Sequence, residues 1–561
     1  MSWPTMGGAG SPITVSGGDL VGSTKTATVV GGTGTIQWAH YNPTTGAYIS
    51  DITGETGTTY VLEESDGGFI VGAYLTNYQP FSHGTTPVPV VRLASASNRL
   101  MMNSGSATAG ANNVRCGRFG DIPKATLTNP KFRIAPSTRV DSTVVSGPQE
   151  VNTNAVVPVR GALLTDLTLD GGGIPVRNQS AATYAEATWF NFANAVAGYS
   201  KKPDGTNPTA GEFAAAGGLI SGDGKQLTVP IGWYGESDEM TITLTKGQIY
   251  LTQYETACAV GSTYAIGSIT TAHPNLGDAG KDNATTGQAV FQKNWDSLTG
   301  VSGTPPVGPL SVVGTSVTGA YTVGVAGDSI ARENSDRVTQ PSGQIFGDVN
   351  GVTAFARRAL SLAGYCSVNV AINGANAANP FTYDGFNVRS WLLGICQAVI
   401  HNIGNNDRGL SWATFQPYWR SYNNRMRAAC NNGAGSGRVV AIDWPPQATS
   451  TDLWATTANQ SANQGPGSMQ YDTFNPFIQA GVFNVGAGDC DAGYSMNKAI
   501  YDLAAANGAT DIDALKVKWP ANGASYAWAA DLTHPTSLPH AYVAADLAPK
   551  LPALLGFNAS T

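Results

Sequence analysis

The chain has 561 residues, and the usual domain size of about 100–200 residues predicts roughly three domains. Charged residues make up 12% of the chain and the net charge is −7, which excludes the basic surface that a nucleic-acid partner requires. The 68 glycines, 31 prolines, 12 tryptophans and 21 tyrosines favour turn-rich β structure. The aromatic residues then pack in β cores or, alternatively, stack on sugars.

The first residues, 1–8, carry neither the basic nor the apolar region of a secretory signal, so we expect no export by that route. No run of 18 apolar residues occurs, and candidates such as 391–400 have the length of a core element. The sequence therefore predicts a soluble protein without membrane insertion. Its six cysteines are scattered and form no C-x-x-C pair, which favours buried free thiols.

Residues 1–90 contain short strand-like segments separated by Gly/Thr turns, as in 35–38, 54–60 and 68–75. This spacing predicts a small β-sandwich. The order of Trp38, a Gly-Thr-Thr-Tyr step and an acidic turn at Ser65 resembles immunoglobulin-like modules of bacterial and phage surface proteins.

Residues 91–315 keep a strand-like pattern, for example at 226–231, 240–244 and 247–254, and predict a second, larger β-sandwich. The Gly/Pro-rich stretches at 81–89 and 300–309 are expected to be linkers on either side of it, with His83 solvated. The strings at 237–244 and 247–251 resemble the β-domain that precedes the catalytic domain in large GDSL-type sugar esterases, which implies a glycan-binding role.

Residues 316–561 alternate β-branched strands with amphipathic helices and predict a three-layer α/β/α domain with a parallel sheet. The expected strands are 321–326, 367–372, 398–403 and 438–443. Apolar spacing predicts a helix from about 350 to 363, ended by Gly364. A second helix is expected to bury five large side chains: Phe415, Tyr418, Trp419, Tyr422 and Met426.

Polar motifs follow three of these strands. They are Gly327-Asp-Ser-Ile330, Asn373-Gly-Ala-Asn376 and Gly404-Asn-Asn-Asp407. Because ligands bind beyond the carboxyl ends of parallel strands, we expect all three motifs to face one crevice. A fourth motif, Asp531-Leu-Thr-His534, places an acid and a base three residues apart, just before a helix beginning near Ser537.

Two of these motifs, and two other histidines of this region, also have a purely structural interpretation. Gly-Asp pairs recur in the chain, so Gly327-Asp-Ser can arise by chance or mark a turn. Asn406 and Asp407 are also typical of a turn cap. His401, inside an apolar strand, is expected to be a hydrogen-bonded core histidine, and His540 to lie on the surface rather than act as a base.

Taken in order, Gly-Asp-Ser, a glycine after the second strand, Gly-x-Asn-Asp and Asp-x-x-His resemble the four sequence blocks of SGNH/GDSL hydrolases, over about residues 320–555. The resemblance implies a serine esterase. Ser329 would be the nucleophile, His534 the base, and Asp531 the residue that orients the imidazole.

The oxyanion would be held by the backbone N–H of Ser329, the N–H of Gly374 and the side-chain amide of Asn406. The second block is shorter here than in many family members, which leaves Asn376 as an alternative donor to Gly374. No His, Cys, Asp or Glu cluster has metal-ligand spacing, so we expect neither metal nor cofactor in catalysis.

For the whole protein, this predicts an esterase that removes acyl groups, above all O-acetyl groups, from a bacterial surface polysaccharide docked on the β-domains. The missing signal suggests a phage virion protein, such as a tail spike or fibre, that is released by lysis and contacts other virion proteins or further copies of itself; otherwise the protein would be cytoplasmic. An alternative is a receptor-binding or decorating virion protein that holds glycans with weak or no hydrolysis. A lipase or thioesterase is disfavoured because no apolar lid segment is apparent.

Overall fold

The computed structural model describes most of the chain, and the statements below concern the described residues. These are 13–17, 22–29, 35–41, 48–66, 69–75, 92–96, 105–108, 114–134, 137–140, 149–152, 157–165, 167–169, 175–177, 189–193, 200–202, 205–230, 233–257, 263–266, 279–284, 311–316, 318–332, 336, 352–377, 385–430 and 437–559. The predicted linkers at 81–89 and 300–309, with His83, lie outside them.

The chain divides into two compact units. The first is Met1–Leu93 with Thr315–Ala320 and Ser560–Thr561, and the second is Ala94–Gly314 with Tyr321–Ala559. The segments predicted as second and third domains therefore share one unit. The predicted limits at 90 and 315 stay predictions.

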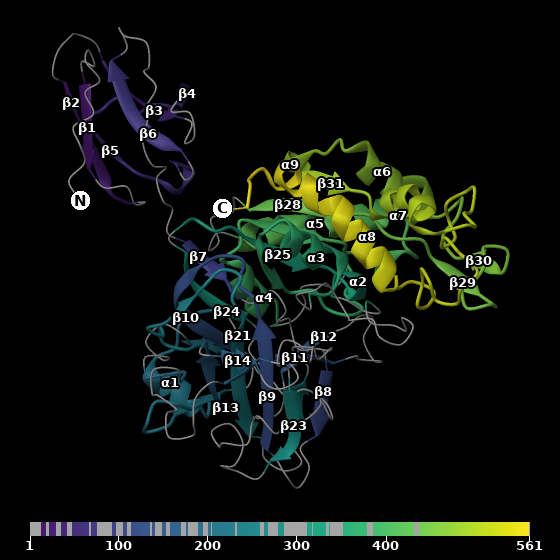
Figure 1. Ribbon diagram of the computed structural model, residues 1–561, viewed down its shortest axis with the longest axis horizontal. Helices are drawn as coiled ribbons and strands as arrows, with labels where there is room; N and C mark the ends of the chain where they lie inside the picture. The colour runs from purple at the N-terminus through teal and green to yellow at the C-terminus, as the bar shows by residue number, and fades with distance from the viewer. Residues whose placement is uncertain are drawn as a thin grey trace. The chain divides into compact units, whose positions relative to one another are not determined.

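The first unit contains two antiparallel three-stranded sheets that share one core (Figure 1). Their strand orders are β1(Ile13–Gly17)-β2(Thr24–Val29)-β5(Thr59–Val61) and β4(Tyr48–Asp51)-β3(Ile36–Tyr41)-β6(Ile70–Leu75). Trp38 is fully buried between them, packs 5.6 Å from the Tyr60 ring and donates its indole N–H to the Gly57 carbonyl at 2.9 Å. Two sheets closed over a buried tryptophan agree with the predicted sandwich; its immunoglobulin-like character stays a prediction.

The first half of the second unit is built from β-sheets. One sheet has the order β16(Ser200–Lys201)-β19(Tyr234–Glu236)-β10(Leu127–Ile134)-β24(Ser311–Ser316)-β7(Arg92–Ser95), with β20(Thr243–Leu244) also paired to β10. The other is β17(Leu219–Ile220)-β18(Leu227–Val229)-β13(Val157–Leu164)-β21(Tyr250–Ala257)-β9(Val114–Asp121)-β23(Ala279–Ala284). The pairs β8(Gly105–Thr108)-β22(Thr263–Ile266), β11(Ser137–Val140)-β12(Gln149–Asn152) and β14(Leu167–Leu169)-β15(Pro175–Arg177), and the helix α1(Ala210–Ala215), complete it.

The second half of this unit carries a parallel five-stranded sheet, as the alternation of strands and helices predicted. Its order is β26(Cys366–Asn369)-β25(Thr322–Ala326)-β27(Ala398–His401)-β28(Arg438–Ile442)-β31(Ala492–Tyr494). The helices are α2(Ser329–Arg332), α3(Phe355–Leu362), α4(Gly385–Leu393), α5(Trp412–Ala429), α6(Asn475–Ala480), α7(Met496–Ala504), α8(Ser537–Leu547) and α9(Leu551–Leu555). A small antiparallel pair, β29(Ala448–Ser450)-β30(Gln460–Ala462), lies outside the sheet.

Successive strand residues point into two different cores, which gives the domain its three layers. Val399, Val439 and Ala441 pack with α4, α5 and α6, whereas Ile400 and Val440 pack with α3, α7, α8 and α9. Because side chains alternate across a strand, near-continuous apolar strands are what a sheet covered on both faces requires. Figure 1 shows α3 and α8 side by side over one face.

Two helices differ from their predictions. The helix expected from about 350 starts only at Phe355, because Ala354 has a left-handed φ of 65° and donates its N–H to Asp336 at 2.6 Å. In α5, Tyr418 is 42% exposed, whereas the other four predicted core side chains are fully buried. Residues 415, 419, 422 and 426 lie along one narrow stripe of a 3.6-residue helix, and residue 418 falls at its edge.

Four cysteines, Cys366, Cys396, Cys430 and Cys490, are free and buried, in agreement with the prediction. The side chains of the other two lie outside the described residues. Among the described helices, none combines the length and apolar character needed to cross a membrane.

Candidate active site

Ser329 lies just beyond the carboxyl end of β25, the strand between β26 and β27, where a sharp turn leads directly into α2. Gly327 makes this turn with a φ of +124°. A Cβ on residue 327 would come 2.1 Å from the side-chain oxygen of Asn402 and 3.1 Å from its backbone nitrogen. The motif therefore needs glycine here for the left-handed backbone and for the close approach of Asn402.

Asp328, the residue before the serine, is fully buried and faces the β27 loop. Its Oδ1 accepts hydrogen bonds from the Asn402 side-chain amide at 3.1 Å and from the Ile330 N–H at 2.9 Å. Its own N–H donates to the Asn402 Oδ1 at 3.3 Å. Burial raises the pKa of Asp328 to about 6, although these hydrogen bonds and the charge of His534 act in the opposite direction.

The C-terminal motif brings its histidine to the serine across 205 residues of sequence. His534 Nε2 lies 2.7 Å from the Ser329 Oγ, and His534 Nδ1 lies 2.7 Å from the Asp531 Oδ2. With Nδ1–H donating to the carboxylate, Nε2 is left to accept the serine proton. The three residues that the sequence singled out as nucleophile, base and orienting acid thus form one continuous hydrogen-bonded chain.

The Asp531–His534 loop is held by its own backbone. Asp531 Oδ1 accepts the N–H groups of Thr533 and His534, each at 2.8 Å. The His534 carbonyl accepts the Ala530 N–H at 2.9 Å, and the Leu532 carbonyl accepts the Ala448 N–H at 3.1 Å. The tight turn explains how an acid only three residues earlier reaches Nδ1, the imidazole nitrogen that does not face Ser329.

This arrangement favours the ionised form of the Asp531 carboxyl group. Partial burial alone would raise its pKa, but the hydrogen bond and positive charge of His534 and the two backbone N–H donors outweigh burial and lower it. The Asp531 side chain is 51% exposed and that of His534 is 19% exposed, so the carboxylate is more open to solvent than the imidazole. Ser329 is recessed, with 7% of its surface exposed.

The three strand-end loops meet because β26, β25 and β27 are neighbours in the sheet. The Ile372 N–H donates to the Gly327 carbonyl at 3.1 Å, which joins the second loop to the serine turn. The Asn406 amide donates to the Ala375 carbonyl at 2.8 Å, which joins the third loop to the second. The three motifs were predicted to face one crevice at this sheet edge, and these hydrogen bonds bring their loops together there.

The predicted oxyanion donors lie in these loops. Gly374 has a φ of +68°, in the turn after β26. Within the described part of the chain, neither its N–H nor that of Ser329 donates to a protein acceptor. The Asn406 amide uses one N–H on Ala375 and keeps a second one. Asn376, the alternative donor, has a hydrogen-bonding or other polar partner of its own.

Sequence reasoning missed two residues that hold the site. Asn402 joins the serine turn to the β27 loop, as described above, but in the sequence it stands inside an apolar strand pattern. Gln447, fully buried after β28, donates its side-chain amide to Asn405. No motif indicates it, since its partner lies 42 residues away. Asp407 also acts structurally, because its carboxylate accepts the Ala377 N–H at 2.5 Å.

The other histidines of the domain are structural. His401 is buried, its Nε2 lies 2.8 Å from the Asn423 Oδ1, and burial lowers its pKa to about 4, so it is the neutral core residue that was predicted. His540 was predicted to lie on the surface and this is wrong: it is fully buried. Its Nδ1 accepts the Phe355 N–H at 3.1 Å, because the first turn of α8 packs on α3 rather than facing solvent.

Within the described ranges, no three His, Cys, Asp or Glu side chains come together in a group that could hold a metal ion.

No family model matches the chain, and no curated protein does. Solved structures similar to it include an active-site mutant of a family two carbohydrate esterase from Clostridium thermocellum, at 12% identity, with 84% of this chain and 99% of that one covered and a TM-score of 0.27. Another is a carbohydrate esterase family 2 enzyme from Corynascus thermopiles, at 14% identity, 83% and 100% coverage and a TM-score of 0.28. A carbohydrate acetylesterase family member from Sinorhizobium meliloti has 13% identity, 42% and 100% coverage and a TM-score of 0.28. These likenesses are distant.

Proposed function

We propose that the protein is a serine carboxylic ester hydrolase of the SGNH/GDSL type. The observation that carries this proposal is the hydrogen-bonded chain from Ser329 Oγ through His534 to Asp531, with 2.7 Å at each step. A nucleophile, a base within hydrogen-bond reach and a group that orients the base are the parts that acyl transfer needs.

In the first half of the reaction, Ser329 Oγ attacks the ester carbonyl carbon while His534 Nε2 takes the hydroxyl proton. The tetrahedral intermediate then collapses: the bond to the leaving oxygen breaks, and His534 returns the proton to the departing alcohol. Ser329 is left as an acyl ester. In the second half, His534 removes a proton from water, the hydroxide attacks the acyl ester, and the carboxylic acid leaves as Ser329 regains its proton. Asp531 stabilises the imidazolium at both steps.

Negative charge on the carbonyl oxygen is proposed to be stabilised by the N–H groups of Ser329 and Gly374 and by the Asn406 amide. Among the described residues, the N–H groups of Ser329 and Gly374 have no acceptor, and Asn406 keeps a second N–H. These donors support the assignment, since donors fixed before the reaction need no reorganisation when charge develops.

The proposed substrates are O-acetyl esters of a bacterial surface polysaccharide. A recessed Ser329, 7% exposed, supports a small acyl group, because a small group reaches a recessed hydroxyl more readily than a bulky one. We further propose, from the sequence pattern around Trp38, that the first unit is an immunoglobulin-like module and that the protein acts as part of a phage virion, such as a tail spike or fibre.

The direct test is acetate release by the full chain from p-nitrophenyl acetate and from acetylated polysaccharide, together with covalent labelling by an organophosphonate. We expect release from both substrates and a single phosphonylated peptide that contains Ser329. Glycan binding without acetate release and without labelling would favour the alternative of a binding protein that does not hydrolyse esters.

Replacing Asn406 by alanine is expected to lower kcat by about 100- to 1,000-fold with a small change in KM, the usual cost of losing one oxyanion donor. Steady-state kinetics with p-nitrophenyl acetate measure it. The control is Asn424→Ala on the exposed face of α5, which should leave kcat unchanged. An equal fall of activity in both variants would point to a folding defect instead of an oxyanion role.

Replacing Asp531 by alanine is expected to lower kcat/KM by about 10²- to 10⁴-fold, less than the loss of either Ser329 or His534. The reason is that the histidine keeps its intrinsic basicity and loses only its orientation and the charge that stabilises its protonated form. The control, Asp502→Ala, removes an exposed carboxylate paired with Lys498. A loss as large as that of Ser329→Ala would contradict a purely orienting role.

A further inference from the structure

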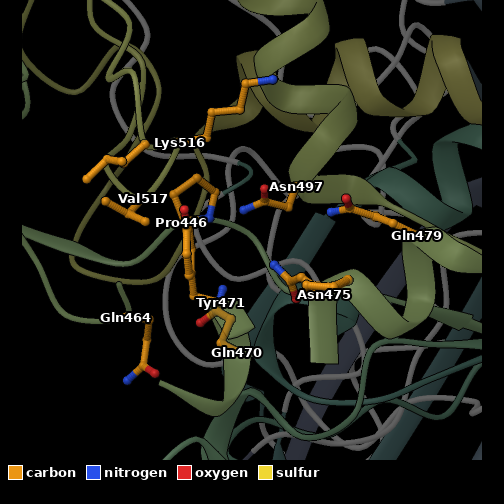
Figure 2. A pocket seen from close by; sticks show the side chains of 11 residues that line it. Pro446, Gln464, Gln470, Tyr471, Asn475, Gln479, Asn497, Lys516 and Val517 are labelled. Carbon is orange, nitrogen blue, oxygen red and sulfur yellow. The ribbon is translucent and has the colours of Figure 1, made fainter. Parts of the chain in front are cut away.

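A pocket of about 320 Å³ lies in the same domain as the candidate active site (Figure 2). Its walls come from the segment after β28, the π-helical turn Gln470–Phe474 that runs into α6, the start of α7 and residues 515–517. Its volume is in the ~300–1,000 Å³ range of pockets that bind small molecules. Single π-helical turns are rare in proteins and frequent at functional sites.

Uncharged carboxamides dominate the lining. Five amide side chains and one phenol surround the cavity: Gln464, Gln470, Asn475, Gln479, Asn497 and Tyr471. In Figure 2, Asn475, Gln479 and Asn497 gather on one side, while Gln464, Gln470 and Tyr471 lie on the other. Each carboxamide offers a donor and an acceptor to a ligand.

Gln470 is fixed with one hydrogen-bonding atom unused. It is 3% exposed, and its Nε2 donates to the carbonyls of Pro445 at 2.8 Å and Trp444 at 3.3 Å. Its Oε1 is buried and has no partner within the described structure, and the same holds for the Oε1 of Gln464. A buried acceptor without a partner is costly, so two of them on one pocket indicate a ligand that supplies donors.

The charges of the lining residues also restrict the class of ligand that the pocket can bind. Lys516 is the one charged residue among those that line it. Figure 2 shows the Lys516 side chain extending away from the amides, and its Nζ lies 5.9 Å from the centre of the Tyr501 ring. No lining residue is a carboxylate. Many donors and acceptors without charge match the hydroxyl groups of a neutral sugar.

The pocket wall is connected to the catalytic loops. Pro446, in the wall, precedes Gln447, whose side chain donates to Asn405 next to the proposed oxyanion donor Asn406. The Gln447 carbonyl accepts the Asn463 N–H at 2.8 Å, and the following Ala448 donates to Leu532 in the loop of the catalytic histidine. The segment 446–448 therefore joins the pocket wall to the loop of the proposed oxyanion donor and to the loop of the histidine.

We propose that this pocket binds a neutral sugar residue of the substrate, adjacent to the sugar whose ester is cleaved. The inference rests on the proposed ester hydrolysis for its biological meaning, but the pocket's affinity for a sugar can be measured without catalysis. It predicts that Gln470 and Gln464 determine affinity for the glycan and leave the chemistry at Ser329 unaffected.

The experiment uses the full chain with Ser329→Ala and titrates it calorimetrically with neutral hexasaccharides of glucose, xylose and mannose, and with tri-galacturonate as a charged comparison. We expect at least one neutral probe to bind. Gln470→Leu and Gln464→Leu, each added to Ser329→Ala, should weaken that binding about three- to tenfold, the effect of one neutral hydrogen bond. Gln248→Leu, on an exposed residue of the β region, and Lys516→Gln should not.

The catalytic half of the test uses chains that retain Ser329. Gln470→Leu and Gln464→Leu should leave kcat/KM for p-nitrophenyl acetate unchanged and raise KM for the acetylated glycan. Unchanged nitrophenyl acetate hydrolysis also shows that each variant folds. Binding only of the charged probe, dependent on Lys516, or no neutral binding in a chain that hydrolyses nitrophenyl acetate, would overturn the inference while leaving the esterase proposal intact. Sugar binding without any hydrolysis would overturn the esterase proposal alone.

Discussion

Ser329→Ala is expected to lower kcat/KM for p-nitrophenyl acetate by about 10⁴- to 10⁶-fold, leaving only the rate that the remaining groups give to direct attack by water. The reason is that the sole atom removed is the Oγ that lies 2.7 Å from the His534 Nε2, the atom proposed to attack the ester carbonyl. Burst and steady-state kinetics on the same preparation measure both the acylation step and turnover.

The matched control for this variant is Ser361→Ala on α3. Ser361 is also 7% exposed, and its Oγ has no hydrogen-bond partner among the described residues. The change is therefore the same in size and burial but lies away from the reacting groups. Equal hydrolysis by wild type and Ser329→Ala would remove Ser329 from the mechanism, and a matching loss in Ser361→Ala would assign the effect to folding.

His534→Ala is expected to cause a loss of similar size, about 10⁴- to 10⁶-fold, because the nucleophile and its base act as a unit. Unlike the serine variant, it should regain part of its activity when imidazole is added, since the deletion leaves space beside an intact Ser329 and Asp531. The measurement is kcat/KM against imidazole concentration, after subtraction of hydrolysis by imidazole alone.

The control is His40→Gln in the first unit, where His40 Nε2 contacts Asp66 at 2.7 Å and glutamine can keep a hydrogen bond. It should retain full activity without imidazole. A double variant, Ser329→Ala with His534→Ala, should be no slower than either single variant. Losses that add in the double variant would mean that the two residues act in separate steps.

The site could be anticipated because its residues stand in short motifs at strand ends. Parallel topology brings the ends of β25, β26 and β27 to one edge whatever the loops contain, so Ser329, Gly374 and Asn406 were placed together by the alternation of strands and helices alone. The reach of His534 to Ser329 could not be derived in this way. It depends on how the 528–536 loop is held, for example by the hydrogen bond from the Ala448 N–H to the Leu532 carbonyl. The histidine of this loop is 205 residues from the serine in sequence.

Where prediction failed, tertiary packing overrode a local pattern. His540 looked like a surface residue of a first helical turn, but α3 supplies a backbone N–H for its Nδ1. The start of the 350–363 helix failed because Ala354 adopts a left-handed φ that periodicity does not reveal. Gln470 and Gln464 gave no signal either, since a pocket assembled from five separate stretches of the chain has no sequence spacing of its own.

The contact between Gly327 and Asn402 has a consequence for how this sequence can change over time. A Cβ at position 327 would overlap the Asn402 side-chain oxygen, and shortening Asn402 would in turn remove a hydrogen-bond donor from the buried Asp328 carboxylate. Neither position can be altered without a loss unless the other changes with it. Among diverging descendants of this chain, positions 327 and 402 should therefore covary, although they lie far apart in the sequence. Asp328, the neighbour of Gly327, is 74 residues from its hydrogen-bond partner Asn402.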